Sequence, residues 1–297
     1  MKLNKNYKAL SPRQILDVLM ARVADSIINK LNRSFQRGLE LDQFIRLANH
    51  HQFSLEREPG LGLLSIRSSQ RSEGGASTIH LREGTSDFVV YASSVWGEDY
   101  QGLDELLLGM EKSIHFIVDA GANIGTTSLA FSRKYPWAQI IGIEADISNW
   151  KLYDTNMNLN HCQNVKRLHA ALWGSHEEVV LSLSRREWGY QVRPQGKRSS
   201  RSYKVETLTL PELIKMSPNG IIDVLKIDIE GAEENVFLSD PESVAQSLQH
   251  VRFLAIELHG PVLDREIKKL LRQCGFALFQ TGETTYARNL SLTPKKE

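Results

Sequence analysis

The sequence contains few cysteines, no long apolar run and almost no net charge, and each shortage excludes a class of protein. Its two cysteines, Cys162 and Cys274, lie far apart without the spacing of a metal site, so we expect a reduced, cytoplasmic protein. No apolar run approaches the ~18 residues that a membrane-spanning helix needs, so we expect no membrane partner. Residues 1–8 lack the apolar stretch of a secretory signal, so no leader is expected. A net charge of +1 disfavours partners held by whole-surface charge, such as duplex DNA.

Enough apolar material is present for a substantial core, because 41% of the 297 residues are hydrophobic and 24% are charged. After Ser11 and Pro12, a typical helix start, apolar residues recur every four positions, which predicts a helix from residue 11 to about residue 50. The apolar stripe needs a cover, either the body of the protein or a second copy, which would make a homodimer. The stripe consists of Ile15, Leu19, Val23, Ile27 and Leu31.

In the remainder of the chain, the spacing of apolar residues changes twice. Between residues 61 and 92, short apolar runs punctuated by glycines predict strands at 63–66, 79–81 and 88–91. From residue 114, runs of strand length alternate with helical segments, such as 126–134 and a helix that a capping box begins at Thr209. This alternation predicts an α/β fold with a Rossmann-like, doubly wound and mainly parallel sheet. The predicted strands are 114–118, 139–143, 165–169, 223–227, 253–257 and 276–280.

These patterns divide the chain into three predicted parts. Residues 1–60 form a helical extension, residues 61–110 a small β-element, and residues 111–297 a cofactor-binding domain. Helices are expected on both faces of the sheet of the third part, so a ligand should bind beyond the carboxyl ends of its strands.

A glycine-rich turn follows the first strand of the third part. Residues 118–125 read Val-Asp-Ala-Gly-Ala-Asn-Ile-Gly, and the next strand ends in Glu144. Such glycines let the backbone approach a nucleoside-bearing cofactor, and the acid accepts hydrogen bonds from a ribose diol. The spacing G-x-x-x-G lacks the third glycine of a dinucleotide site, and no P-loop lysine follows. The pattern therefore favours S-adenosylmethionine over a dinucleotide or a nucleoside triphosphate.

Two later strands end in polar residues that we expect to act in catalysis. Asp228 and Glu230 follow one strand, Glu257 and His259 follow the next, and residues two apart on an extended chain share a face. At neighbouring strand ends, these four side chains would surround the reacting atoms. A hydroxyl group that accepts a methyl group needs a base. His259 is the preferred base because its unperturbed pKa of about 6.5 suits neutral pH, and Glu257 or Glu230 is the alternative. The same residues could instead hold Mg²⁺.

Residues 185–204 form a basic segment that interrupts the alternation. Arginines and lysines dominate it, and Trp188, Tyr190 and Tyr203 are interleaved. Two interpretations stay open: a solvated loop, or a loop that folds over the ligand edge of the sheet and grips the substrate.

Together these residues resemble the FkbM-type family of S-adenosylmethionine-dependent methyltransferases, which have the class I methyltransferase fold. The similarity runs in order from about residue 79 to residue 280 and leaves residues 1–60 uncovered. The chain departs from the family pattern at Ala145, where many relatives carry proline, but Glu144 stays in place. The matching stretches are 81–87, 118–129, 143–146 with Asn149, 169–173, 225–233 and 256–259.

The resemblance implies a role for each stretch. Glu144 would hold the ribose hydroxyls, and Asp228 would face the methyl group and its acceptor. Family members commonly methylate hydroxyls of sugars, glycans or secondary metabolites, which implies an O-methyltransferase with a small-molecule or glycan acceptor. The methionine and ribose end of the cofactor would be lined by Asp119, Gly121, Asn123 and Gly125, and the adenine would lie near Ala170, Ala171 and Trp173.

Three other functions compete with this prediction. A nucleic-acid or protein methyltransferase would use the basic segment 185–204, but the near-zero net charge and the lack of a recognisable RNA-binding module count against it. Glu144 would fit the ribose of NAD in an NAD-dependent oxidoreductase, but the third glycine of a dinucleotide site is missing, which argues against this function. A cofactor-binding protein without catalysis would have no need for polar residues at two strand ends.

Overall fold

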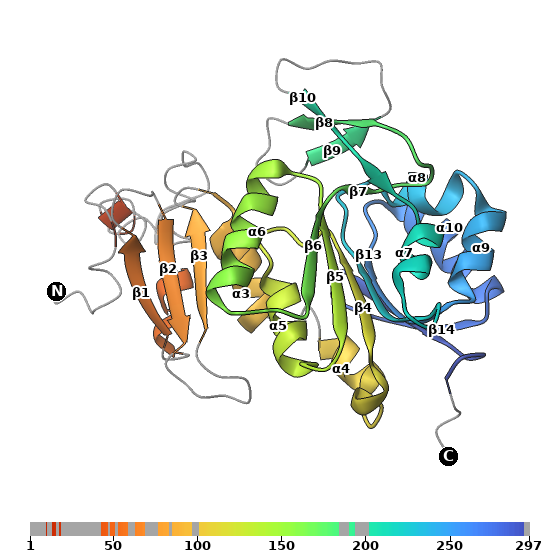
Figure 1. Cartoon of the computed structure of the whole chain (residues 1–297), viewed down its shortest axis with the longest axis horizontal. Helices are drawn as coiled ribbons and strands as arrows, with labels where there is room; N and C mark the ends of the chain where they lie inside the picture. Colours follow the sequence, from red (N-terminus) through yellow and green to blue (C-terminus); the bar gives the residue numbers. More distant parts are fainter. Residues whose placement is uncertain are drawn as a thin grey trace, which may run out of the picture. The chain divides into compact units, whose positions relative to one another are not determined.

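A computed structural model describes most of the chain (Figure 1). The described residues are 10, 14–15, 18, 43–46, 48–50, 53–58, 63–68, 77–82, 85–96, 101–183, 190–193 and 202–293. They fall into two compact units, of which the first comprises residues 1–97 and 158–161 and the second residues 98–157 and 162–297. The domain boundaries drawn on the sequence at residues 60 and 110 stay a prediction.

The first unit contains a three-stranded antiparallel sheet in the order β1-β2-β3. Its strands are β1 (Phe53–Glu58), β2 (Leu63–Ser68) and β3 (Thr78–Arg82), which confirms two of the predicted strands. The predicted strand at 88–91 is wrong, because those residues lie in helix α3 (Asp87–Trp96). Asp87 fixes the start of this helix: its buried carboxylate accepts hydrogen bonds from the backbone and the guanidinium of Arg82. A short apolar run has no period that separates a strand from a buried helix.

The predicted helix from residue 11 to about residue 50 lies mostly outside the described residues. Residues 14–15, 18, 43–46 and 48–50 are helical. A homodimer formed through this segment stays a prediction.

The second unit is built, in its described part, around a seven-stranded sheet with the order β14-β15-β13-β12-β4-β5-β6 (Figure 1). Neighbouring strands are parallel except at β15, which is antiparallel to both β13 and β14. This confirms the predicted doubly wound, mainly parallel sheet, and β15 is a strand that the prediction missed. The strands are β4 (Phe116–Ala120), β5 (Gln139–Glu144), β6 (Val165–His169), β12 (Ile222–Ile227), β13 (Val251–Glu257), β14 (Phe276–Thr281) and β15 (Thr284–Asn289).

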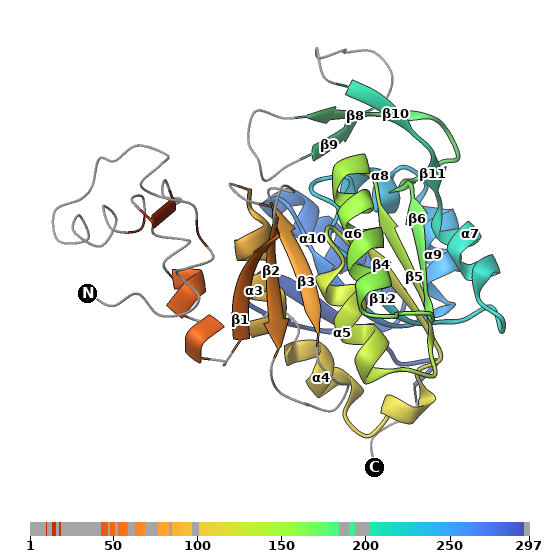
Figure 2. The same cartoon turned by 60° about the vertical axis from the view of Figure 1, so that its left-hand side comes forward.

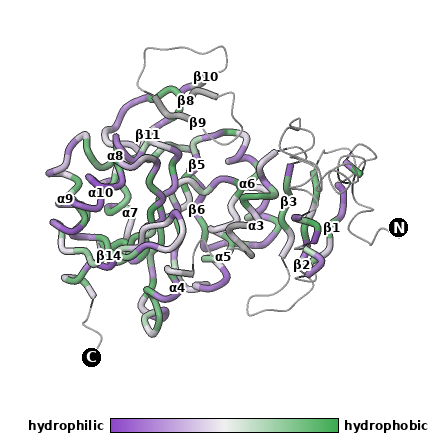
Figure 3. The backbone as a smooth tube through the Cα atoms, turned by 180° about the vertical axis from the view of Figure 1, so that it is seen from behind, coloured by the Kyte–Doolittle hydropathy of each residue, from purple (hydrophilic) through white to green (hydrophobic). Residues whose placement is uncertain are grey.

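Helices cover both faces of this sheet (Figures 1 and 2). One face carries α5 (Thr126–Lys134) and α6 (Ile147–Leu159), and the other carries α7 (Leu210–Met216), α8 (Glu233–Leu238), α9 (Pro241–Leu248) and α10 (Pro261–Gln273). The short helices α4 (Gln101–Leu107) and η2 (Glu111–Ser113) precede β4. Apolar residues run along the central strands (Figure 3), where side chains such as Phe116, Leu225 and Leu254 are buried in one core.

Local sequence signals set the ends of two of these helices. α5 has the predicted bounds. α7 begins directly after the predicted capping box, in which the backbone N–H of Thr209 donates to the Glu212 carboxylate at 2.8 Å. Among the described helices, none is both long and apolar enough to cross a membrane.

Two small sheets lie between β6 and β12 in the sequence. Strand β7 (Ala171–Leu172) pairs in parallel with β11 (Thr207–Leu208), and β8 (Val179–Leu183) lies between its antiparallel partners β9 (Tyr190–Arg193) and β10 (Ser202–Val205). The interpretation of 185–204 as a loop is therefore wrong for the stretches in β9 and β10. Its remaining residues lie outside the described part, so a role in substrate binding stays a prediction.

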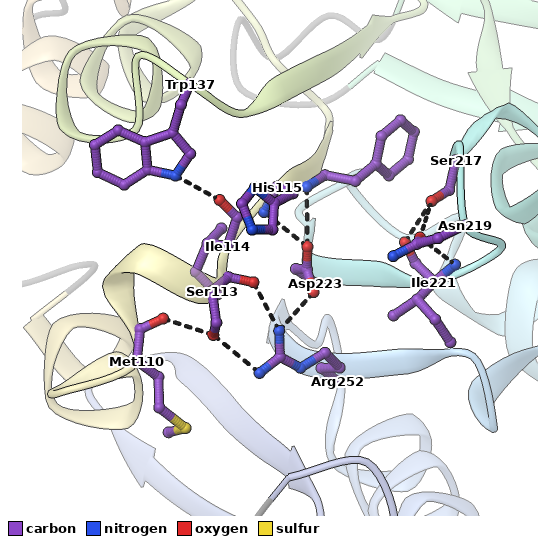
Figure 4. Close-up of polar contacts among 11 residues, drawn as sticks. Met110, Ser113, Ile114, His115, Trp137, Ser217, Asn219, Ile221, Asp223 and Arg252 are labelled. Atoms are coloured by element: carbon purple, nitrogen blue, oxygen red, sulfur yellow. Dashed lines mark hydrogen bonds and ion pairs between the residues drawn. The ribbon is translucent and has the colours of Figure 1, made fainter.

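A polar network holds the amino ends of the central strands together (Figure 4). Asp223 accepts hydrogen bonds from the backbone N–H groups of His115 and Phe116 at 2.8 and 3.0 Å. Arg252 donates to the same carboxylate at 2.7 Å and to the carbonyl oxygen of Ser113 at 2.9 Å. The network joins β4, β12 and β13 at the edge of the sheet opposite to their carboxyl ends.

Candidate functional site

The strand order reverses between β4 and β12, and this is where ligands bind in doubly wound sheets. From β4 the chain builds outward through β5 and β6, and from β12 it builds in the other direction through β13. The segments that follow β4 and β12 are in close contact. The backbone N–H of Asp228 donates to the carbonyl oxygen of Ala120 at 3.0 Å, and a Cβ atom on Gly121 would lie 1.7 Å from the Asp228 carbonyl oxygen. Only glycine fits at position 121.

The glycine turn, residues 121–125, has left-handed backbone at three positions. Gly121, Asn123 and Gly125 have φ angles of +77°, +51° and +91°, which are left-handed. The N–H groups of Gly121 and Ala122 both donate to the carbonyl oxygen of Ile143 at 2.9 Å. The turn therefore packs against the carboxyl end of β5 and leads into α5.

Glu144 is the residue that ties this turn to β5. Its carboxylate accepts hydrogen bonds from the backbone N–H groups of Asn123 at 2.8 Å and of Asp146 at 2.7 Å. The side chain is buried, and burial raises its pKa to about 7 although both hydrogen bonds oppose the shift. Each carboxylate oxygen has a second lone pair, so Glu144 can still accept hydrogen bonds from a ribose diol.

Asp119 lies beneath the glycine turn and is fully buried. Its Oδ2 atom accepts a hydrogen bond of 2.6 Å from the hydroxyl of Ser128, and Oδ1 lies 3.2 Å from Nζ of Lys226. Charge attraction, rather than an aligned hydrogen bond, holds Oδ1. Lys226 also donates to the carbonyl oxygen of Gly121 at 2.8 Å. These contacts make Asp119 a support of the turn, and its predicted contact with the cofactor stays a prediction.

Lys226 was missed by the sequence reasoning, although a signal was present. It is the single charged residue in the apolar run Val224-Leu225-Lys226-Ile227 of β12, and a lysine in a buried strand needs a partner.

The three residues predicted to lie near the adenine are buried in packing. Ala171 and Trp173 belong to a small apolar cluster with β8 and β10, and Ala170 belongs to the main core. The indole N–H of Trp173 donates to Glu177 at 2.8 Å. Their side chains are only 3–6% exposed, so the adenine contact stays a prediction.

The structure brings together the four polar residues predicted at the strand ends, which we call the strand-end cluster: Asp228, Glu230, Glu257 and His259. The Nε2 atom of His259 lies 3.7 Å from a carboxylate oxygen of Glu230 and 3.7 Å from one of Glu257. One ligand atom each of Asp228, Glu257 and His259 lies within 4.8 Å of the others. The cluster occupies the carboxyl ends of β12 and β13, beside the glycine turn.

Glu233, in the first turn of α8, is a further member of the site that sequence reasoning missed. Its Oε1 atom lies 3.0 Å from Nδ1 of His259, and the side chain is completely buried. The hydrogen bond to Glu233 raises the pKa of His259 to about 9, although burial opposes the shift. This pKa differs from the value near 6.5 that made His259 the preferred base. The signal in the sequence was an acid three positions after Glu230.

The carboxylates of the strand-end cluster are also perturbed. Burial, followed by the charge of Asp228, raises the pKa of Glu230 and that of Glu257 to about 7. Glu230 has a φ angle of +54°, which is unusual for a residue with a side chain. Strained backbone of this kind is concentrated at functional sites.

A model of a protein family matches this part of the chain. The model of the methyltransferase FkbM domain matches residues 119–278. This range begins at Asp119 and includes the glycine turn, Glu144 and the strand-end cluster.

Comparison with individual proteins identifies similar chains, among them two relatives and two solved structures. The chain is 30% identical over 192 residues to methyltransferase sdnD of Sordaria araneosa, covering 54% of this chain and 73% of that protein. It is 27% identical over 140 residues to methyltransferase 1 of Beauveria bassiana, covering 41% of this chain and 56% of that protein, or about half of its length. The structure of methyltransferase FkbM from Methylobacillus flagellatus aligns with a TM-score of 0.40 and 13% identity over 59% of this chain and 43% of that chain. That of precorrin-6y C5,15-methyltransferase from Geobacter metallireducens aligns with a TM-score of 0.35 and 12% identity over 59% and 78%.

Proposed function

The chain belongs to the FkbM methyltransferase family, and on this premise we propose that it transfers a methyl group from S-adenosylmethionine to a hydroxyl group of a small molecule or glycan. The observation that carries the proposal is the strand-end cluster beside the glycine turn. A methyltransferase needs a cofactor site next to a place where a weakly acidic acceptor loses its proton. The proposal is supported by the position of the glycine turn and the strand-end cluster, which lie at the strand reversal between β4 and β12.

The residues around the glycine turn fit the nucleoside part of this cofactor. Gly121 and Asn123 have a left-handed backbone and are partly exposed just before α5, so a nucleoside could approach the chain closely there. Glu144 offers the free lone pairs of a buried carboxylate to the ribose hydroxyls. When bound, S-adenosylmethionine supplies an electrophilic methyl group on a positively charged sulfur.

The strand-end cluster binds the acceptor and accepts its proton. The bound cofactor would supply the methyl group, and the residues of this cluster would position the acceptor oxygen to receive it. The acceptor hydroxyl also loses a proton, which a carboxylate of the cluster takes up. The cluster thus orients the acceptor and removes its proton, while the turn holds the cofactor in line.

Calorimetric titration of the purified chain with S-adenosylmethionine, S-adenosylhomocysteine and NAD tests the cofactor assignment. We expect micromolar binding of the first two ligands and none of NAD. Binding of NAD alone would overturn the proposal in favour of an oxidoreductase.

Transfer of a labelled methyl group to a panel of acceptors tests the substrate class. The panel contains hydroxylated metabolites, oligosaccharides, an RNA oligonucleotide and a mixture of peptides. We expect label on hydroxylated acceptors, with little effect of salt on their binding. Label on RNA alone, with an affinity that falls steeply as salt is added, would contradict the proposed acceptor class.

A further inference from the structure

We infer that Asp228, Glu257 and His259 form a binding site for a divalent ion of the first transition series. The inference deepens the proposed function and rests on it for the role of the ion in methyl transfer. One donor atom from each residue lies within 4.8 Å of the other two. Donor atoms bound to one such ion at about 2.1 Å are separated by about 3–4 Å, so the three side chains need to close by only a small distance.

The sheet itself presents these donors from one edge. β12 and β13 are parallel neighbours, and Ile227 pairs with Ile256 in their register. Asp228 and Glu257 are the residues that follow this pair, so their backbones lie side by side. His259 lies two positions after the end of β13, and one of its ring nitrogens lies within 4.8 Å of a carboxylate oxygen of Asp228 and of one of Glu257. The positions of the donors are therefore set by paired backbone and not by a long loop.

Glu233 provides an independent observation that points to a metal ligand. A histidine that binds a metal almost always directs its other ring nitrogen to a carboxylate or a carbonyl group, which fixes the ring and its tautomer. His259 has this arrangement: Nδ1 faces Glu233, and Nε2 faces Glu230 and Glu257. Glu233 is completely buried, and its Oε2 atom has no hydrogen-bond partner. If His259 is a metal ligand, the buried carboxylate of Glu233 would fix the orientation and the tautomer of its ring.

The balance of charge favours the same conclusion. Four carboxylates, those of Asp228, Glu230, Glu233 and Glu257, lie around the single imidazole of His259. The ammonium group of Lys226 is directed to Asp119 and to the carbonyl oxygen of Gly121. Partly buried carboxylates at such short distances repel one another, and a divalent cation between them would remove this repulsion.

The donor set selects the kind of ion. Mg²⁺ prefers oxygen ligands and holds several of its waters, whereas imidazole nitrogen suits ions such as Zn²⁺, and Mn²⁺ accepts carboxylates. Two carboxylates and one imidazole therefore favour Mn²⁺ or Zn²⁺ over Mg²⁺, the ion that the sequence left open as an alternative. With three side chains as ligands, open positions of the ion would bind the acceptor oxygen. Glu230 lies outside the ligand set and is left to take the proton.

Titration of the full chain with Mn²⁺ tests the site without any need for activity. After removal of metals with EDTA, the signal of free Mn²⁺ in electron paramagnetic resonance reports how much ion is bound. We expect one Mn²⁺ per chain and weaker binding of Mg²⁺. Asp228→Asn and Glu257→Gln should each lower the Mn²⁺ affinity by at least tenfold, and Glu233→Gln by about ten- to a hundredfold through the ring of His259.

Glu234→Gln is the matched control, because Glu234 is an exposed acid next to Glu233 and its change removes the same charge. We expect the Mn²⁺ affinity of this variant to equal that of the parent chain. Circular dichroism on each variant separates loss of the site from loss of the fold.

Two outcomes would overturn the inference. One is a parent chain that binds neither Mn²⁺ nor Zn²⁺ at millimolar concentration, and the other is unchanged affinity in the folded Asp228→Asn and Glu257→Gln variants. Titration of the same preparations with S-adenosylmethionine separates this failure from failure of the proposed function. Cofactor binding without metal binding would refute the metal site alone, and metal binding without cofactor binding would refute the proposed function alone.

Discussion

The Nζ atom of Lys226 lies 3.2 Å from Oδ1 of Asp119 and donates a hydrogen bond of 2.8 Å to the carbonyl oxygen of Gly121. Both side chains are almost completely buried. One ammonium group thereby joins the carboxyl end of β12 to Asp119 in β4 and to the turn that follows β4. The pair neutralises two charges in the core and sets the position of the glycine turn relative to the strand-end cluster.

The variant Lys226→Met is expected to lower the free energy of unfolding by about 3–5 kcal/mol, because it leaves the Asp119 carboxylate buried without a cation. Urea denaturation measures this change. The double variant Asp119→Asn/Lys226→Met should recover part of the loss, and equal losses in the single and double variants would contradict coupling of the pair. Arg252→Met, at the opposite edge of the sheet, should lower stability without changing the affinity for S-adenosylmethionine.

Gly121→Ala is expected to lower the free energy of unfolding by more than about 3 kcal/mol, because a left-handed φ angle of +77° combines with a Cβ atom 1.7 Å from the Asp228 carbonyl oxygen. Gly109→Ala is the control: Gly109 has a φ angle of +81°, but its Cβ atom would meet no atom within 4 Å. It should cost only about 1 kcal/mol. Similar losses in both variants would mean that the turn can move away from the segment after β12.

Cofactor binding should depend on pH through Glu144. Burial raises the pKa of Glu144 to about 7, and the carboxylate must be ionised to accept both amide hydrogen bonds and the ribose hydroxyls. Affinity for S-adenosylmethionine should therefore rise as the pH increases through 7 and be about tenfold lower at pH 6 than at pH 8. Calorimetry across this range measures it. Glu144→Gln should bind more weakly and with little pH dependence, and a parent-like pH profile in this variant would assign the titration to another group.

Glu230→Gly is expected to raise stability by about 1 kcal/mol, because glycine adopts the φ angle of +54° without strain. The same variant should lower turnover, since it removes the carboxylate to which we assign the proton. Glu230→Gln retains the strain and should lower turnover without the gain in stability. Full activity in both variants would exclude Glu230 as the base.

Local patterns in the sequence were sufficient for most of the central domain. The predicted bounds of β6 and α5 agree with the structure, and the capping box at Thr209 begins α7. Glycine spacing predicted the turn at residues 121–125, and the structure adds its left-handed φ angles. These features depend on neighbours within a few residues, such as a run of apolar side chains, a cap or a residue without a Cβ atom.

Errors arose where contacts outside a short apolar run decide its structure. The run at 88–91 is helical because it follows Asp87, which begins α3 and accepts hydrogen bonds from Arg82. Strand β15 was missed because it forms a hairpin with β14 and inserts antiparallel beside β13. A short apolar run is compatible with both a strand and a buried helix, so tertiary packing decides between them.

The sequence by itself determined the α/β class, the glycine turn and the presence of four polar residues at two strand ends. Only the tertiary structure decided which groups these residues meet. Lys226 reaches Asp119 across 107 positions, and Glu233 meets His259 across 26. Both contacts result from the pairing of parallel strands, which brings distant carboxyl ends to one edge of the sheet. The pKa of a side chain at this edge depends on its burial and on neighbouring charges. Neither burial nor neighbouring charge is encoded within a short window of residues.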